Sequence, residues 1–140
     1  MKNHMFHIAF ASSNFNAARH FYGKILQLPE GRSGLNWVDY NFYGNQLTIQ
    51  EIQQSVEVKM NYRHPKSGMP LNHFGVILPW DEFHTLVNRL HEADVFPIVD
   101  EQTVMEGEVG EQKIIMFQDP DANVIEFKTF KDLKSVFATE

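Results

Sequence analysis

Hydrophobic and polar positions alternate in two matching stretches of the chain, one near its start and one near its middle. Met5–Ala11 has the sequence MFHIAFA and Leu71–Leu78 the sequence LNHFGVIL, and both show the two-residue period of a β-strand. Apolar residues at helical spacing follow in each case, over Phe15–Leu26 and from Asp81, the predicted N-cap, to Leu90. Each half of the chain is therefore predicted to begin with a strand and then a helix.

Three extended stretches follow each predicted helix. In the first half they lie around Arg32, at Asn36–Tyr43 and at Gln46–Ile52, with a hairpin turn at Gly44-Asn45. The predicted strands of the second half are Val95–Val99, Lys113–Gln118 and Asn123–Phe127. The order is thus βαβββ twice, which makes the fold class α+β with two similar modules.

The chain of 140 residues is predicted to form a single domain, because its length and its apolar fraction of 43% suit one core. The best internal boundary is the segment 61–70, NYRHPKSGMP, which interrupts the hydrophobic pattern with Pro and Gly. Module 1 is predicted at about 4–60 and module 2 at 71–130. Residues 131–140 form a C-terminal arm, with a short helix predicted over Phe130–Phe137.

Composition excludes several classes of function. The net charge is −6, without a cluster of basic residues, which disfavours nucleic acid as a partner. No apolar run is long enough to span a membrane, and no signal-peptide cleavage pattern is present, so a cytoplasmic location is expected. The absence of Cys removes disulfides and thiolate ligands. Histidine and carboxylate remain as the metal ligands open to this chain.

Two histidines occupy matching places in the two first strands. His7 and His73 each lie on a strand face with small neighbours, which leaves room for a ligand. Glu126 is placed mid-strand among core residues, where an unpaired carboxylate would be costly. Two His and one carboxylate can bind a divalent cation such as Zn, Fe(II), Mn, Ni or Co. The repeat offers Gln50 as a fourth position, because Ile49-Gln50 matches Ile125-Glu126.

Ordinary structural roles compete with this interpretation. A lone His in a strand is usually structural, and the joint occurrence in both halves is what favours a metal site. His84 and His91 share one helix face, which indicates a solvated surface. Asp119 and Asp121 are explained by turn chemistry. Arg32, Trp37, Tyr40 and Lys128 are candidates for lining a pocket, which the sequence does not separate from packing.

Three segments of the sequence resemble the vicinal-oxygen-chelate proteins, which include glyoxalase I, extradiol dioxygenases, fosfomycin-modifying enzymes and bleomycin-binding proteins. The segments are FHIAFASSNFNAARHFYGKILQLPEG, NHFGVILP and FQDPDANVIEFKTF, and the likeness extends over about residues 5–130. The resemblance implies that the two modules pair into a cup-shaped, incompletely closed mixed β-barrel around a divalent metal, with the helices outside.

The resemblance also implies a ligand set. The family's metal positions fall on His7, His73 and Glu126, and the fourth falls within Gln46–Ile52. Gln50 is preferred there, and its neighbour Glu51 would point to the opposite face. If Gln50 does not bind, the remaining three residues form a two-His-one-carboxylate face suited to Fe(II). Glu126 can double as a base if it leaves the metal.

These observations favour a metal-dependent lyase, isomerase or ring-cleaving dioxygenase, in which Zn, Ni, Fe(II) or Mn chelates adjacent oxygens of a small-molecule substrate. The alternative is a non-enzymatic module that sequesters an antibiotic-like ligand in a metal-free cup, and a third interpretation makes both His purely structural. A homodimer is expected. The substrate stays open, because specificity would come from the loops Gly31–Asn36, Tyr62–Met69 and Glu106–Glu111.

Overall fold

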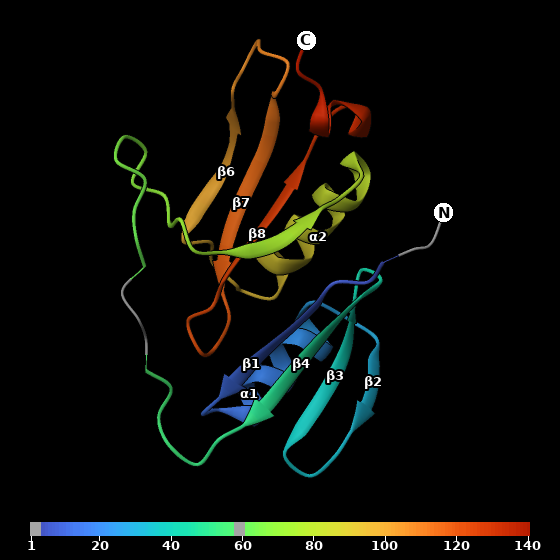
Figure 1. The fold of residues 1–140 in the computed structure, drawn as a ribbon, viewed down its shortest axis with the longest axis vertical. Coiled ribbons are helices and arrows are strands. Elements are labelled where there is room, and N and C mark those ends of the chain that lie inside the picture. Colours follow the sequence, from blue (N-terminus) through green and yellow to red (C-terminus); the bar gives the residue numbers. More distant parts are fainter. Residues whose placement is uncertain (1–3, 58–60) are drawn as a thin grey trace. The chain divides into compact units, whose positions relative to one another are not determined.

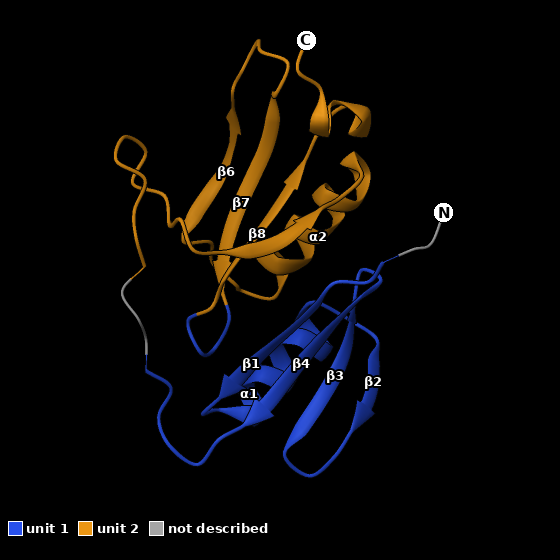
Figure 2. Ribbon diagram, in the orientation of Figure 1, with its two compact units in different colours: residues 1–59, 119–122 blue, residues 60–118, 123–140 orange. Residues whose placement is uncertain are grey.

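The structure is a computed structural model that describes residues 4–57 and 61–140, and its chain divides into two compact units. Among these residues, unit 1 contains 4–57 together with the short segment Asp119–Ala122, and unit 2 contains 61–118 and 123–140, as Figure 2 shows. The predicted end of module 1, at residue 60, lies outside the described residues. Each unit has one four-stranded sheet.

Unit 1 has the order strand, helix and three strands (Figure 1). Its elements are β1 (His7–Ser12), α1 (Phe15–Arg19), the π-helical turn η1 (His20–Ile25), β2 (Glu30–Ser33), β3 (Trp37–Phe42) and β4 (Asn45–Glu51). The strand order in the sheet is β1-β4-β3-β2, in which β1 is parallel to β4 and the other neighbours are antiparallel.

The core of unit 1 lies between one face of this sheet and the helical segment. Val38 and Tyr40 on β3 are 0% and 2% exposed, and the two-residue strand period places both on the helix side. The ring of Tyr22, which is fully buried, lies 6.0 Å from that of Tyr40. Gly23 lies close to the same ring, because a Cβ there would lie 3.3 Å from the Tyr40 hydroxyl oxygen.

The first helical segment differs from the single helix predicted over Phe15–Leu26. The α-helix ends at Arg19 and continues as η1, in which the Leu26 N–H donates to the Phe21 carbonyl five residues back, at 2.9 Å. Asn14 is the N-cap, and its side chain accepts a hydrogen bond from the Ala17 N–H. The predicted position of the segment is therefore right, and its uniform α-geometry is wrong.

The segment Asp119–Ala122 joins unit 1 through two buried aspartates. The Tyr22 hydroxyl donates to Asp119 Oδ2 at 2.6 Å, and the Ser13 backbone N–H donates to Asp121 Oδ1 at 3.0 Å. Turn chemistry is also present, since the Asp121 N–H donates to Asp119 Oδ1. The expectation that turn chemistry alone explains these aspartates is corrected, because Asp121 also binds Ser13 just before the first helical segment and Asp119 binds Tyr22 within it.

Unit 2 repeats the same order of elements. They are β5 (Phe74–Ile77), α2 (Trp80–Glu92), β6 (Val99–Val104), β7 (Gln112–Gln118), β8 (Val124–Thr129) and the 3₁₀ helix η2 (Leu133–Phe137). The strand order is β5-β8-β7-β6, with β5 parallel to β8 and the other neighbours antiparallel. The α+β class and the two predicted βαβββ modules are confirmed.

The sheet of unit 2 buries apolar side chains on both faces. Helix α2 buries the side chains of Phe83, Leu86, Val87 and Leu90, which are at most 5% exposed. A second cluster contains Ile114, Met116 and Val124, three residues that strand register places on the same face as Glu126. Met69, Val99 and Val104 pack against that cluster. Glu126 is therefore a carboxylate in apolar surroundings.

Three predicted boundaries in these elements are wrong. The strand predicted at Val95–Val99 lies at Val99–Val104, because β6 is a polar edge strand without a hydrophobic period. The hairpin turn between β3 and β4 is Tyr43-Gly44, whose φ values of 52° and 88° suit a type I′ turn. Helix α2 is capped by Pro79, and Asp81 instead lies in its first turn.

No helix within residues 4–57 and 61–140 is both long and apolar enough to cross a membrane.

Candidate functional site

His73 and Glu126 come together in unit 2. His73 directly precedes β5, and its Nε2 lies 3.7 Å from Oε2 of Glu126 on the neighbouring strand β8. Its Nδ1 lies 2.9 Å from the Pro70 carbonyl oxygen, which must receive an N–H, so Nε2 is the ring nitrogen that faces the carboxylate. A metal-binding histidine is typically held in this way by a backbone carbonyl.

Gly75 sets the distance between the strands that carry these two residues. It is paired with Glu126 in the parallel β5/β8 ladder. A Cβ at this position would overlap the carbonyl oxygen of Glu126 and lie 2.7 Å from the carbonyl carbon. Glycine is thus required where β5 approaches the backbone of β8.

Lys128 occupies the other oxygen of the Glu126 carboxylate. Its Nζ lies 3.0 Å from Oε1. The Glu126 side chain is 8% exposed and that of Lys128 is 30% exposed, so the ammonium reaches a buried carboxylate from the rim. The two oxygens of Glu126 therefore face different partners, Lys128 on one side and His73 on the other.

The pair of His73 and Glu126 fits part of a divalent-cation site. Two ligands that each lie about 2.0–2.2 Å from one tetrahedral metal are roughly 3.3–3.6 Å apart, and the observed separation is 3.7 Å. Imidazole and carboxylate are ligands for Zn, Mn, Ni and Fe(II). No group of three His, Asp or Glu converges anywhere among the described residues, so unit 2 brings together two of the predicted ligands and no complete set.

His7 lies in unit 1, as the first residue of β1, where it is exposed. It lines a cavity of about 660 Å³ together with Arg32, Asp39 and Gln46, among others. The structure therefore gives His7 access to a space that admits a small molecule.

Asp39 is a polar centre of this cavity that the sequence analysis missed. It is 7% exposed, and it accepts hydrogen bonds from Thr48 Oγ1 at 2.6 Å and from Gln46 Nε2 at 3.1 Å. Arg32 Nη2 lies 3.7 Å from Asp39 Oδ2. The alternation in WVDYNF was the available signal, because Val38, Tyr40 and Phe42 on the core face leave Asp39 on the opposite one.

Strand register tests the internal alignment that suggested Gln50. His73 precedes Gly75, the partner of Glu126, by two residues. In unit 1, His7 precedes Ala9 by two residues, and the partner of Ala9 is Thr48. Thr48 therefore holds the place that Glu126 holds in unit 2.

Gln50 itself lies away from His7 in unit 1. It pairs with Ala11, four residues or roughly 13 Å along the strand from His7. Its Nε2 donates to the carbonyl oxygens of Asn36 and Glu51, at 3.1 and 3.2 Å. Unit 1 does not bring Gln50 and His7 together, and the fourth ligand stays a prediction.

The remaining histidines have local contacts or lie on the surface. His84 Nδ1 lies 2.8 Å from the Trp80 carbonyl oxygen one turn earlier in α2. The His64 ring accepts backbone N–H groups of Lys66 and Ser67. His91 is exposed, as expected for a solvated helix face.

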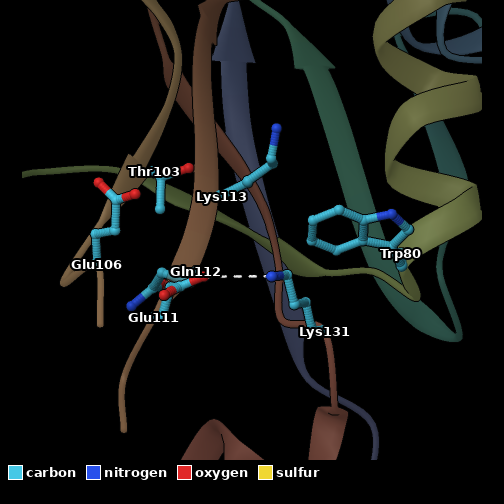
Figure 3. A pocket seen from close by; sticks show the side chains of 7 residues that line it. All are labelled: Trp80, Thr103, Glu106, Glu111, Gln112, Lys113 and Lys131. Carbon is cyan, nitrogen blue, oxygen red and sulfur yellow. Dashed lines mark ion pairs between the residues drawn. The ribbon is translucent and has the colours of Figure 1, made fainter. Parts of the chain in front are cut away.

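Unit 2 has a second cavity, of about 190 Å³, near the start of α2. Figure 3 shows its lining residues, Trp80, Thr103, Glu106, Glu111, Gln112, Lys113 and Lys131. Lys131 lies 3.7 Å from Glu111, and Lys113 Nζ lies 5.7 Å from the centre of the Trp80 ring. The two lysines and two glutamates balance in charge, and none of the lining residues belongs to the His73 and Glu126 pair.

Comparison with known proteins confirms the predicted fold. No family model matches the sequence. A glyoxalase/bleomycin resistance protein/dioxygenase from Alicyclobacillus acidocaldarius matches with a TM-score of 0.78 and 22% identity, over 96% of this chain and 97% of that one.

Two further solved structures have the same fold. The fosfomycin resistance protein FosX from Listeria monocytogenes matches with a TM-score of 0.69 and 20% identity, over 98% of this chain and 100% of that one. Lactoylglutathione lyase from Agrobacterium tumefaciens matches with a TM-score of 0.64 and 15% identity, over 94% and 96%. At these identities the likeness is one of fold, and the chain has the fold of the vicinal-oxygen-chelate superfamily.

Proposed function

We propose that this protein is a divalent-metal-dependent enzyme of the glyoxalase/dioxygenase type that acts on a small molecule with two adjacent oxygens. The observation that carries the proposal is the arrangement of His73 and Glu126, in which Nε2 of the imidazole faces a buried carboxylate while Nδ1 is held by a backbone carbonyl. Because the same fold hosts several activities, the reaction class rests on the site rather than on the likeness.

Each residue of the pair has a definable task. His73 binds through Nε2, and its hydrogen bond to the Pro70 carbonyl oxygen fixes the ring. Glu126 binds through Oε2, while its Oε1 is held by Lys128. Met116 and Val124, which are buried, lie on the same face of the sheet as this carboxylate. A bound divalent cation supplies Lewis-acid polarisation of the substrate oxygens. Glu126 is also our candidate for the base that accepts a substrate proton.

His7 is proposed as the third ligand, from the same chain or from a second copy in a homodimer. His7 begins the first strand of its module and His73 directly precedes the first strand of the other, and both are exposed. Size-exclusion chromatography with light scattering tests the dimer. The cytoplasmic location stays a prediction from composition.

Metal content tests the proposal directly. Protein purified without added metal is incubated with Zn, Ni, Mn or Fe(II), desalted and analysed by mass spectrometry. We expect about one metal per chain. His73→Gln and Glu126→Gln should each lower occupancy about 10-fold or more, because each removes a ligand. The identity of the bound metal then separates oxygen chemistry, with Fe(II), from isomerase or lyase chemistry.

His91→Gln is the matched control, because it removes an exposed imidazole from the same unit. It should leave occupancy unchanged. A wild-type protein that retains none of the four metals would contradict the proposal. A loss of metal occupancy in His91→Gln as large as that in His73→Gln would contradict it as well.

A sequestration protein is the second candidate function. The cavity of about 660 Å³ in unit 1 favours it, since Met5 and Phe6 in its lining are 75% and 60% exposed. Cavities of this volume suit drug-sized molecules. Tight binding of a cationic aromatic dye by metal-free protein, with no metal uptake, would favour this candidate over the enzyme.

A further inference from the structure

The carboxylate of Glu126 already contacts a cation that the protein itself supplies, the ammonium group of Lys128. Lys128 Nζ lies 3.0 Å from Oε1, whereas His73 Nε2 lies farther, 3.7 Å from Oε2. The lysine is two residues along β8, so both side chains lie on the same face of the strand. The ion pair is thus built into a single strand.

The surroundings leave Lys128 one acidic partner. Its neighbours in the strand register are Ile77 on β5 and Ile114 on β7, both uncharged. Glu126 is the partner of every ion pair found for Lys128 within the described residues. An ion pair to a carboxylate that is 8% exposed is screened less than one at the surface.

We propose that Lys128 competes with a divalent metal for Glu126 and so sets the metal affinity of the site. This inference rests on the proposed metal site. A cation that binds Oε2 must share the carboxylate with an ammonium already at Oε1, and the two positive charges repel each other. Metal binding would weaken the ion pair between Lys128 and Glu126, and the bound metal would then be repelled by the ammonium. Both effects lower the affinity for the metal. Lys128 therefore weakens metal binding, and a neutral residue there strengthens it.

The competing interpretation is that Lys128 only holds Glu126 in place. A positioning role predicts the opposite sign, because a neutral side chain would leave the carboxylate less well oriented and metal binding weaker. The direction of the change in affinity therefore separates the two roles.

The test is titration of the full-length protein with Zn²⁺ and Mn²⁺ by calorimetry, before and after Lys128→Met. We expect binding at least about 10-fold tighter in the variant. Lys128→Arg, which keeps the charge, should bind as wild type does. Lys128→Gln is a second neutral variant in case Lys128→Met fails to fold, which circular dichroism checks. The gain should shrink as NaCl rises from about 0.05 to 1 M.

Lys134→Met is the matched control, because it removes the same charge from an exposed site in the same unit. It should leave affinity unchanged. Equal or weaker binding by both neutral variants overturns the inference while the proposed function stands. Absence of binding in wild type and in every variant overturns both. Binding by the neutral variants alone supports the competition and shows that the native lysine prevents loading.

Discussion

Buried oxygen atoms with defined partners are the main feature at the scale of single residues. Tyr22 is fully buried and donates to Asp119, which is 5% exposed. Burial raises the pKa of Tyr22 well above its ordinary value of 10.0, and the charge of Asp119 raises that pKa further. The phenol therefore stays protonated in the folded protein at a pH where an unfolded chain would lose the proton.

This pKa shift predicts a loss of stability in alkali. A raised pKa in the folded state contributes stability that is present below pH 10 and is lost as the pH rises beyond it. The free energy of unfolding, measured with urea between pH 8 and 11, should fall steeply above about pH 10. Tyr22→Phe should flatten this fall, and it should cost about 1–3 kcal/mol at pH 7 because Asp119 loses a donor.

Tyr62→Phe is the control, since Tyr62 is 71% exposed and its loss should leave the profile unchanged. Burial also raises the pKa of Tyr40, so the fall should be reduced in Tyr22→Phe rather than abolished. An identical alkaline profile in wild type and Tyr22→Phe would contradict the assignment.

Residue roles were predictable from the sequence only in part. The matched places of His7 and His73 follow from the repeat, and the buried position of Glu126 follows from the apolar residues beside it. The role of Lys128 was not separable from that of a surface residue, because it depends on one contact, with Glu126, and the partners of Asp39 lie on other strands. Such contacts depend on which strands pair and in which register.

Close approach of backbones is the main feature at the scale of elements. Gly75 lets β5 lie against the part of β8 that holds Glu126. The equivalent place in unit 1 is Ala9, beside Thr48. The two modules thus share one topology, but unit 1 has Thr48 at the place where unit 2 has the carboxylate of Glu126.

Gly75→Ala should therefore disturb both stability and metal binding. The added methyl group would overlap the Glu126 carbonyl, so we expect a loss of about 1–3 kcal/mol in the free energy of unfolding. Displacement of Glu126 should also weaken metal uptake. Gly31→Ala is the matched control, because a Cβ there meets its nearest atoms at 3.6 Å, an ordinary contact. Equal effects of the two substitutions would show that Gly75 has no special role.

The order of elements was predictable because most strands and both helices bury one face. Apolar alternation marks β3, and a helical stripe marks α2. Strands β2 and β6 lack such a signal, since both are polar edge strands. This is why β2 was predicted only around Arg32 and β6 was placed too early.

At the scale of the whole molecule, the main feature is that unit 1 is made of two separate stretches of the chain. Asp119–Ala122 comes from the second half of the sequence but belongs to this unit (Figure 2). Tyr22 and Asp119 are 97 positions apart along the chain and 2.6 Å apart in space. Sequence periodicity carries no information about such a contact, and the predicted boundary at 61–70 does not anticipate it.

A double-mutant cycle in the full-length protein tests this long-range contact. Tyr22→Phe and Asp119→Asn should be coupled by about 0.5–3 kcal/mol in the free energy of unfolding, because the first removes and the second weakens the same charge-assisted hydrogen bond. Tyr22→Phe combined with Asp132→Asn is the control, since Asp132 caps η2 in unit 2 and the effects should add. Additive effects in the first pair would contradict the contact.

This discontinuous unit has a practical consequence for the design of chimaeras between related proteins. A crossover in the segment 61–70 looks natural, because it separates the two sequence repeats. It would nevertheless combine Tyr22 from one parent with Asp119 and Asp121 from the other, inside unit 1. A chimaera that exchanges modules cleanly must also receive Asp119–Ala122 from the parent that supplies unit 1.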